Sequence, residues 1–317
     1  MSNHLDEQRV TNTDPREHSY HPSYTSEGPY LSEKPRRGGT MRNLALAFVF
    51  LAIVGTGVTF WGLVASRQTA ILPEHAFHVA GHTRLVVNNT AGKIHIHPGT
   101  TSGIVVQGTK YAQGLGASLD DVTVNYEQQG DTVSVTSDET WNFMSERGVN
   151  LDIAVPSTTD LQVKNTSGNV EIEQITGNID AQSVSGGIEA SNLNGTIKLS
   201  STSGGIHLDN ANGIMTLSTI SGGIDANNIQ LHGQSSLMST SGGITFEGSL
   251  DPRGSYRMEA VSGGIDLTLP TNAAFKLDAS TTSGNVNNEF GSSAVGSAPQ
   301  PALTLHTTSG GIEIHKQ

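Results

Sequence analysis

Serine residues next to glycine recur along the C-terminal half of the chain, and serine can act as a nucleophile. A nucleophilic serine needs a general base within hydrogen-bond reach and a site that stabilises an oxyanion. Eight equivalent serines cannot each have both, and none lies in a Gly-x-Ser-x-Gly motif. We therefore predict that the pairs form turns, and we expect neither catalytic residues nor a cofactor. The pairs are Ser167-Gly168, Ser185-Gly186, Ser203-Gly204, Ser221-Gly222, Ser241-Gly242, Ser262-Gly263, Ser283-Gly284 and Ser309-Gly310.

The residue that follows each turn's hydrophobic residue should point outward, and these residues would form a column. Its members are Glu171, Glu189, His207, Asp225, Thr245, Asp266, Asn287 and Glu313. Like charges stacked about 5 Å apart repel by about 1 kcal/mol in water, so a cation between the acidic members would be favourable. As a hypothesis, the consecutive residues Glu189, His207 and Asp225 bind a divalent metal ion weakly. The alternative is a solvated outer face with one histidine that relieves the repulsion.

A second group of metal-ligating residue types lies nearer the N-terminus. His75, His78 and His82 are close in sequence, and His95 and His97 would share one face of a strand. Histidine is a common metal ligand. No carboxylate recurs at a matching spacing, so the sequence does not predict a metal site here.

The spacing of the Ser-Gly pairs predicts the strands and turns that would hold the residues of the column. The first four Ser-Gly pairs are eighteen residues apart, and Ile or Val stands two residues after each pair. A weaker repeat at Gly177, Gly195 and Gly213 halves the period to nine, which suits one short strand and one tight turn. Such strands are too short to be stable as separate hairpins.

Stacking as coils of a solenoid solves this problem, because each strand then bonds to its equivalent roughly 4.8 Å away. The pattern predicts one inward ladder through Ile188, Ile206 and Ile224 and an opposing ladder through Ile179, Ile197 and Met215. Glycine would permit positive φ at the recurring corners. We predict an all-β domain, a parallel β-solenoid, whose last coil at residues 302–315 caps its open end.

Composition narrows the class of protein. The chain of 317 residues has no cysteine, which excludes disulfides, thiolate catalysis and cysteine-based zinc sites. Its formal net charge of -12 argues against a nucleic-acid partner, because phosphate neutralisation requires an excess of Lys and Arg. Residues 68–317 carry ten Lys and Arg against twenty-three Asp and Glu, so the acidity lies after the apolar segment described next.

Residues 43–66 contain no charged side chain, and Leu44 to Val64 could cross a hydrocarbon core about 30 Å thick as a helix. Trp61 would be an interfacial anchor. Four basic residues precede the segment and only Arg67 follows closely, which places the N-terminus in the cytoplasm and the C-terminal domain outside. If translation began at Met41, the same segment would look more like a secretion signal.

The expected organisation therefore has five parts. Residues 1–42 form a disordered cytoplasmic tail, 43–66 a single transmembrane helix and 67–80 a stalk. Residues 81–160 form an N-terminal region of β-strands, and 161–317 form the Ser-Gly repeat solenoid.

Two stretches resemble a bacterial adhesin-like family of unknown function. The first runs from Leu151 to Val170 and leads into repeated Ser-Gly-Gly-Ile, and the second is Asn88-Asn89-Thr90-Ala91-Gly92-Lys93-Ile94. The resemblance covers roughly residues 80–317. It implies a membrane-associated repeat fold and adhesion, and it provides no catalytic residues.

The leading functional prediction is a single-pass membrane protein whose extracellular solenoid binds or scaffolds an envelope polymer, a host polymer or a surface protein, without catalysis. A sensor or regulator of envelope stress that signals through the N-terminal tail is the second hypothesis. A polysaccharide-degrading β-helix enzyme is the third, although Lys and Arg are sparse and no long loops build a cleft.

Overall fold

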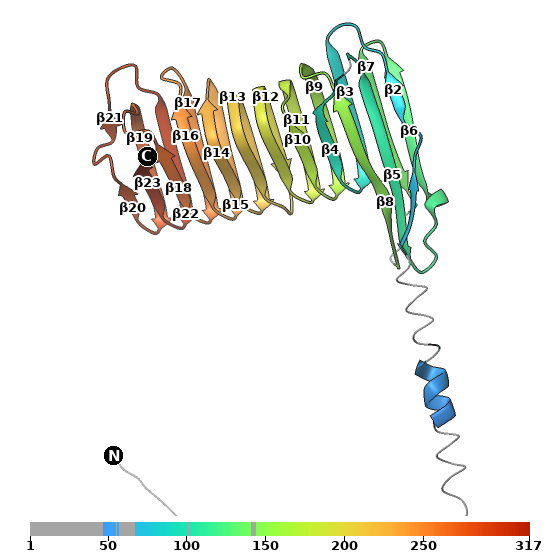
Figure 1. The fold of residues 1–317 in the computed structure, drawn as a ribbon. Helices are drawn as coiled ribbons and strands as arrows, with labels where there is room; N and C mark the ends of the chain where they lie inside the picture. Colours follow the sequence, from blue (N-terminus) through green and yellow to red (C-terminus); the bar gives the residue numbers. More distant parts are fainter. Residues whose placement is uncertain (1–46, 55, 57–66, 101, 141–143) are drawn as a thin grey trace, which may run out of the picture. The chain divides into compact units, whose positions relative to one another are not determined.

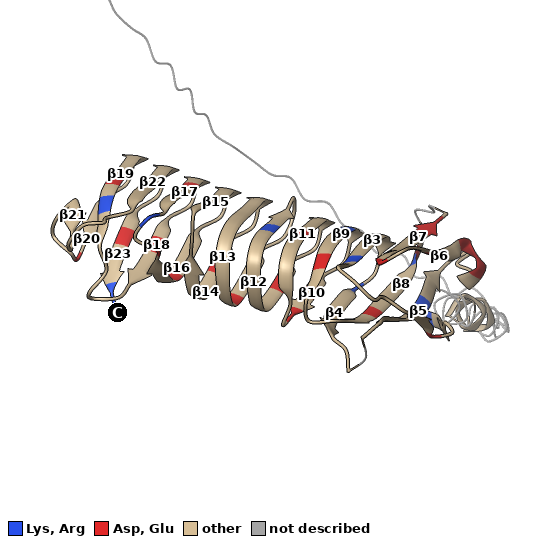
Figure 2. Ribbon diagram, turned by 90° about the horizontal axis from the view of Figure 1, so that it is seen from above, with Lys and Arg blue, Asp and Glu red and all other residues tan. Residues whose placement is uncertain are grey.

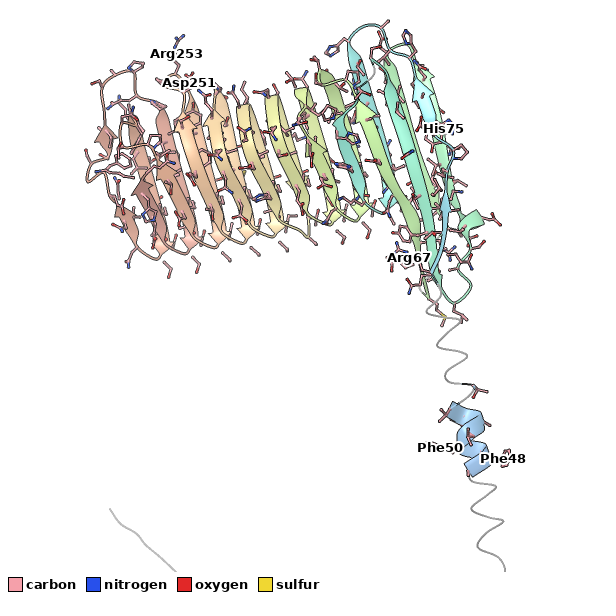
Figure 3. The ribbon with its side chains drawn as sticks, viewed as in Figure 1. Phe48, Phe50, Arg67, His75, Asp251 and Arg253 are labelled. Atoms are coloured by element: carbon pink, nitrogen blue, oxygen red, sulfur yellow. The ribbon has the colours of Figure 1, made fainter. Side chains whose placement is uncertain are left out.

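The computed structural model describes residues 47–54, 56, 67–100, 102–140 and 144–317. The chain divides into two compact units, Met1–Thr56 and Gly57–Gln317. In the first unit the described residues are helical, and Phe48 and Phe50 are exposed on that helix (Figure 3). Among the described residues, no helix has the length and apolar character that a membrane span requires. The expected tail and the anchor residues Leu44, Trp61 and Val64 lie outside the described residues.

The second unit is all-β (Figure 1). Within its described residues the strands are β1 (Arg67–Ile71), β2 (His75–Phe77), β3 (Thr83–Ala91), β4 (Ile94–Pro98), β5 (Ile104–Gly114), β6 (Val122–Gln129), β7 (Thr132–Glu139), β8 (Ser145–Val155), β9 (Thr159–Ser167), β10 (Val170–Glu173), β11 (Thr176–Ser185), β12 (Ile188–Ser201), β13 (Ile206–Ser221), β14 (Ile224–Leu231), β15 (Gln234–Ser241), β16 (Ile244–Leu250), β17 (Ser255–Ser262), β18 (Ile265–Leu269), β19 (Phe275–Ser283), β20 (Val286–Asn288), β21 (Ala294–Val295), β22 (Ala302–Ser309) and β23 (Ile312–Lys316). A short 3-10 helix, η1 (Leu119–Asp121), precedes β6.

These strands form two ladders of parallel strands, which are the two walls of a solenoid. The first ladder runs β7, β3, β9, β11, β12, β13, β15, β17, β22 and β19. The second ladder runs β8, β4, β10, β12, β13, β14, β16, β18, β23 and β20. The long strands β12 and β13 bend and take part in both ladders.

The core lies between the two ladders, and the alternation of each strand fills it. Ile188, Ile206 and Ile224 are paired in register and buried, as the inward ladder requires. Ile179, Ile197 and Met215 form the opposing buried ladder. Burying side chains of this size stabilises the fold by about 1.5–3 kcal/mol each, so the stacked apolar ladders are the main source of stability.

The order of the coils at both ends departs from the order of the sequence. At the C-terminal end β22 lies between β17 and β19, and β23 lies between β18 and β20. The coil of β19 and β20, not the last coil in sequence, therefore ends the stack. The prediction that residues 302–315 form the cap was wrong, because the chain passes over one coil position between β18 and β19, and residues 289–301 return it to that position as β22 and β23.

The N-terminal end shows the same interleaving. The coil of β3 and β4 lies between the coil of β7 and β8 and the coil of β9 and β10. Residues 81–160 and 161–317 thus share one continuous stack rather than forming successive regions. Residues 67–80 are also not a free stalk, because β1 and β2 pair antiparallel with β5, which pairs antiparallel with β8. Together with β6 on β7, these antiparallel strands cover the N-terminal end of the stack.

The glycines of the Ser-Gly corners are required mainly by close stacking of the backbone. A Cβ on Gly204 would lie 2.3 Å from the carbonyl oxygen of Gly186 in the neighbouring coil, and Gly204 does not have a left-handed φ. Positive φ, expected at every such corner, occurs at four of the eight, with φ of 112–159° at Gly168, Gly242, Gly284 and Gly310. The left-handed corners between the two walls are instead occupied mostly by asparagine, at Asn192, Asn210 and Asn228, with φ of 54–56°.

Beside most Ser-Gly corners stands a polar inward side chain, two residues before the serine, and these side chains stack from coil to coil. Their hydroxyls donate to the carbonyl oxygen of the corner glycine in the neighbouring coil, as in the bond of 2.8 Å from Thr219 Oγ1 to Gly204. The same bond is made by Ser201 to Gly186, Ser239 to Gly222, Thr307 to Gly263 and Thr281 to Gly310. This hydroxyl ladder satisfies carbonyl groups that the tight corners leave unpaired.

Candidate functional site: a face of histidines and carboxylates

The outer surface of the second ladder carries a column of side chains, one from each coil, and all but two of them are acidic or histidine. Strand register gives the order of the column as Asp152, His95, Glu171, Glu189, His207, Asp225, Thr245, Asp266, Glu313 and Asn287. We call this surface the histidine–carboxylate face. Figure 2 shows the acidic residues distributed from coil to coil along the stack.

The predicted triplet occupies the middle of this face. Glu189 is paired with His207, and His207 with Asp225, so the three residues are consecutive as expected. An open hollow of about 230 Å³ lies between Glu171, Glu189 and His207. Three groups of described residues bring at least three possible ligand atoms within 4.8 Å of one another, and none of them contains a member of the predicted triplet.

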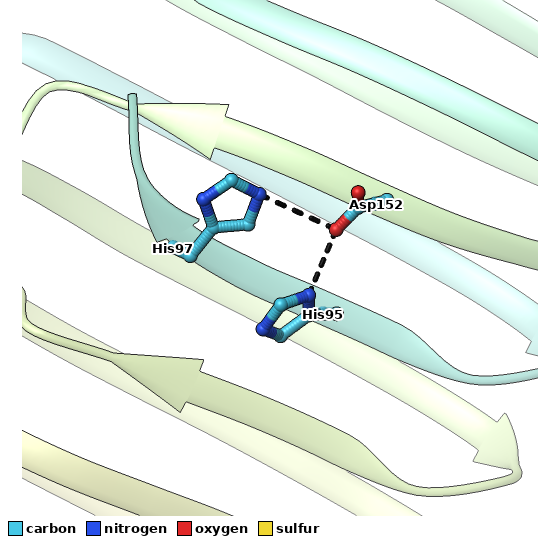
Figure 4. Close-up of side chains that lie close together, drawn as sticks. All are labelled: His95, His97 and Asp152. Atoms are coloured by element: carbon cyan, nitrogen blue, oxygen red, sulfur yellow. Dashed lines mark hydrogen bonds and ion pairs between the residues drawn. The ribbon is translucent and has the colours of Figure 1, made fainter. Parts of the chain in front are cut away.

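The strongest of these groups lies near the N-terminal end of the face and consists of His95, His97 and Asp152 (Figure 4). His95 and His97 are two residues apart on β4, so both rings point to the same side, and β8 places Asp152 beside His95. The Oδ1 atom of Asp152 lies 2.8 Å from His95 Nδ1 and 3.4 Å from His97 Nε2. The side chains of both histidines are 31% exposed, so the group is accessible from solvent.

Neighbouring charges surround this group. His95 also forms a second group with Glu171 and Glu173, and its Nε2 atom lies 3.9 Å from Glu173 Oε1. Lys93 forms an ion pair with Glu171, and this hydrogen bond raises the pKa of Lys93 above its ordinary value. Glu171 is therefore paired with Lys93, whereas Glu173 has its carboxylate near Nε2 of His95, on the other side of the ring from Asp152.

The third group lies at the other end of the face and consists of Asp266, Glu313 and His315. His315 Nδ1 lies 3.1 Å from Glu289, and its Nε2 lies 3.4 Å from Glu313 and 3.7 Å from Asp266. The hydrogen bond with Glu289, together with the other carboxylates, raises the pKa of His315. The backbone N–H of Lys316, which donates to Glu289, and the bond to His315 lower the pKa of Glu289.

The remaining predicted histidines lie elsewhere. His75 (labelled in Figure 3) stacks on Tyr126 with ring centroids 4.1 Å apart. The Nε2 atom of His82 lies 2.8 Å from Oδ2 of Asp160. Burial alone would raise the pKa of Asp160, but hydrogen bonds from Asn178 and His82 outweigh it and hold this pKa below its ordinary value. His75, His78 and His82 are not members of the three ligand groups formed by the described residues.

The eight Ser-Gly pairs lie at the corners where a first-ladder strand passes into a second-ladder strand. The outer surface beside these corners holds an open hollow of about 470 Å³ on the first ladder. Its lining is rich in Ser and Thr and includes the exposed apolar side chains Val184, Ile220 and Met238. The residues that line this hollow include no carboxylate and one lysine, Lys164, in contrast to the histidine–carboxylate face.

Sequence reasoning missed the role of His95, although a signal for it was present. Residues Asn89 to His95 read Asn-Thr-Ala-Gly-Lys-Ile-His, and Asn165 to Glu171 read Asn-Thr-Ser-Gly-Asn-Val-Glu. Aligning these motifs places His95 in the same column as Glu171, as the structure does. Asp152 carries no such signal, because no Asn-Thr-x-Gly motif precedes it.

Comparison with known proteins gives a family and two distant structures. Residues 82–315 match the sequence model of the Toastrack DUF4097 family. A solved structure of a “putative adhesin” from Bacteroides fragilis NCTC 9343 is 14% identical, covers 77% of this chain and 97% of that one, and has a TM-score of 0.43. A “putative cell adhesion protein” from Clostridium sporogenes ATCC 15579 is also 14% identical, covers 77% and 99%, and has a TM-score of 0.26. No curated protein matches the sequence.

Proposed function

Because the chain belongs to the Toastrack DUF4097 family, a family defined without a known function, we propose a role for it from its own surface. We propose that it is a non-catalytic binding or scaffold protein of the cell envelope. An N-terminal membrane segment holds it, and the solenoid stands outside the membrane, where adhesion is one form that such binding would take.

The observation that carries this proposal is the register of the histidine–carboxylate face. Each coil presents its outward residue at the same position, and neighbouring coils are separated by roughly 4.8 Å. A ligand that repeats along its own length can contact several coils at once, and many weak contacts then add to a large total affinity. The excess of carboxylates favours ligands that carry positive charge, such as amino-bearing envelope polymers or basic protein surfaces.

The sequence before the solenoid supports the membrane part of the proposal. Residues 43–66 lack charged side chains, and basic residues are concentrated on their N-terminal side. This arrangement would present the acidic domain outside the membrane and keep the tail inside.

A binding assay with the full-length purified chain tests the proposal. The chain would be immobilised and exposed to a panel of amino-bearing, neutral and acidic polymers at several salt concentrations. The test variant removes three charges from the face through Glu189→Gln, Asp225→Asn and Asp266→Asn. The matched control removes three charges from the antiparallel end through Glu127→Gln, Asp138→Asn and Glu146→Gln.

The proposal predicts salt-sensitive binding to amino-bearing polymers that the face variant loses and the control retains. Equal loss in both variants would show that net charge, not the face, is responsible, and absence of binding to the whole panel would contradict the proposal. Release of reducing sugars from any polymer would contradict its non-catalytic part.

A further inference from the structure

The hydrogen bonding of His97 fixes which of its nitrogens carries a proton. His97 Nδ1 lies 3.2 Å from the carbonyl oxygen of Pro98. A carbonyl oxygen only accepts hydrogen bonds, so Nδ1 carries the proton and donates it. In the neutral ring, Nε2 is then an unprotonated acceptor, and it faces an oxygen of the Asp152 carboxylate 3.4 Å away.

Two acceptors facing each other at this distance are unfavourable unless a positive charge stands between them, which is either a second proton on the ring or a metal ion. A metal ion supplies that charge, and a backbone carbonyl on the other ring nitrogen is the usual means of orienting a metal-bound histidine. His95 completes the arrangement, because its Nδ1 lies 2.8 Å from the same carboxylate oxygen and its ring centroid lies 4.9 Å from that of His97.

The distances suit a small tetrahedral ion. Ligands bound to Zn²⁺ at about 2.0–2.1 Å are roughly 3.3 Å from one another. The separation between His97 and Asp152 already has this value, and that between His95 and Asp152 needs to open by about half an ångström once the ion replaces the proton on His95 Nδ1. Two imidazoles with one carboxylate favour zinc-like ions over Ca²⁺ or Mg²⁺, which prefer oxygen ligands.

We propose that His95 Nδ1, His97 Nε2 and the Asp152 carboxylate bind one zinc-like divalent ion, with the remaining position open to solvent or to a ligand. Glu173 lies 3.9 Å from the other nitrogen of His95, too far for a hydrogen bond, but its negative charge favours a proton on that nitrogen and so leaves Nδ1 free for the ion. The backbone fixes the three ligands, because β4 and β8 are paired with His95 opposite Asp152. The ion would lie on the histidine–carboxylate face, near its N-terminal end.

The experiment uses the full-length chain with Zn²⁺ alone, measured by isothermal titration calorimetry, and with Co²⁺ alone, whose visible absorption reports the ligand set. We expect one site that His97→Gln and Asp152→Asn each abolish. Glu173→Gln removes a nearby charge but no ligand, so the site should remain, with weaker affinity than in the wild type. The controls are His207→Gln, on the same face, and His315→Gln, which removes the histidine of the third ligand group.

Circular dichroism and thermal unfolding verify that each variant is folded, and the site is exposed enough for conservative changes to be tolerated. Failure of the wild type to bind either ion, or unchanged binding in His97→Gln and Asp152→Asn, would overturn the proposal. Retention by His97→Gln with loss in Glu173→Gln would place the ion between His95, Glu171 and Glu173 and would also overturn it. No polymer is present, so the outcome is independent of the proposed binding function.

Discussion

The two glycines of each Ser-Gly-Gly-Ile corner should respond oppositely to substitution by alanine. A Cβ on Gly204 would lie 2.3 Å from the carbonyl oxygen and 2.5 Å from the carbonyl carbon of Gly186. A Cβ on Gly205 would meet no atom closer than 3.4 Å. The chain already has asparagine in place of the second glycine at Asn169 and Asn285, which agrees with the looser packing.

The magnitudes follow from these distances. Overpacking costs about 1–3 kcal/mol, and we expect Gly204→Ala at the upper end, near 3 kcal/mol, because the atoms it meets are backbone that cannot rotate away. Gly205 does not have a left-handed φ. Gly205→Ala should therefore be neutral or should stabilise by about 0.4–1 kcal/mol through the lower entropy of the unfolded chain.

Urea unfolding followed by circular dichroism measures this difference. With a slope of about 2 kcal/mol per molar urea, a loss of about 3 kcal/mol lowers the midpoint by roughly 1.5 M. Equal effects of the two substitutions, or a greater loss from Gly205→Ala, would refute the close stacking at the first glycine.

Two further predictions concern the hydroxyl ladder and pH. Thr219→Val removes the donor to the Gly204 carbonyl at nearly constant volume and should cost about 1–3 kcal/mol in urea unfolding, whereas Ser183→Ala should cost less, because the Ser183 hydroxyl has no partner. The pKa of His315 is higher in the folded protein than in the unfolded chain, where it is near 6.5. Protonated His315 therefore stabilises the fold fully below about pH 6.5, and this stabilisation is lost as the pH rises through the pKa of the folded state. Unfolding with a chelator present should show His315→Gln destabilised relative to wild type at about pH 5.5 and similar to it at about pH 8; a difference that grew with pH would contradict this.

The repeat could be predicted from the sequence because each coil contains the same pattern, a Ser-Gly pair with Ile or Val two residues after it. Ile188 and Ile206 stand in the same phase of an eighteen-residue period, and stacking in register follows from that phase alone. The residues of the hydroxyl ladder are also visible in the sequence, because Ser or Thr stands two residues before most Ser-Gly pairs. Their hydrogen bonds could not be predicted, because the accepting carbonyl groups belong to the neighbouring coil.

The order of the end coils could not be predicted from this pattern. Ile265, Ile312 and Val286 have equivalent settings, so periodicity does not say which coil stacks on which. The candidate metal site depends on the same information. Asp152 meets His95 only because β4 is inserted between β8 and β10, although the two residues are far apart in sequence.

Labelling of single introduced cysteines tests the central claim, that the solenoid stands outside the membrane on an anchored chain. The chain has no cysteine, so Thr245→Cys on the exposed face and Ser26→Cys in the tail each give one reactive thiol without background. Intact cells would be treated with a small charged maleimide that does not cross the membrane. We predict that Thr245→Cys reacts on intact cells and that Ser26→Cys reacts only after lysis; the reverse pattern, or reaction of both only after lysis, would contradict the account.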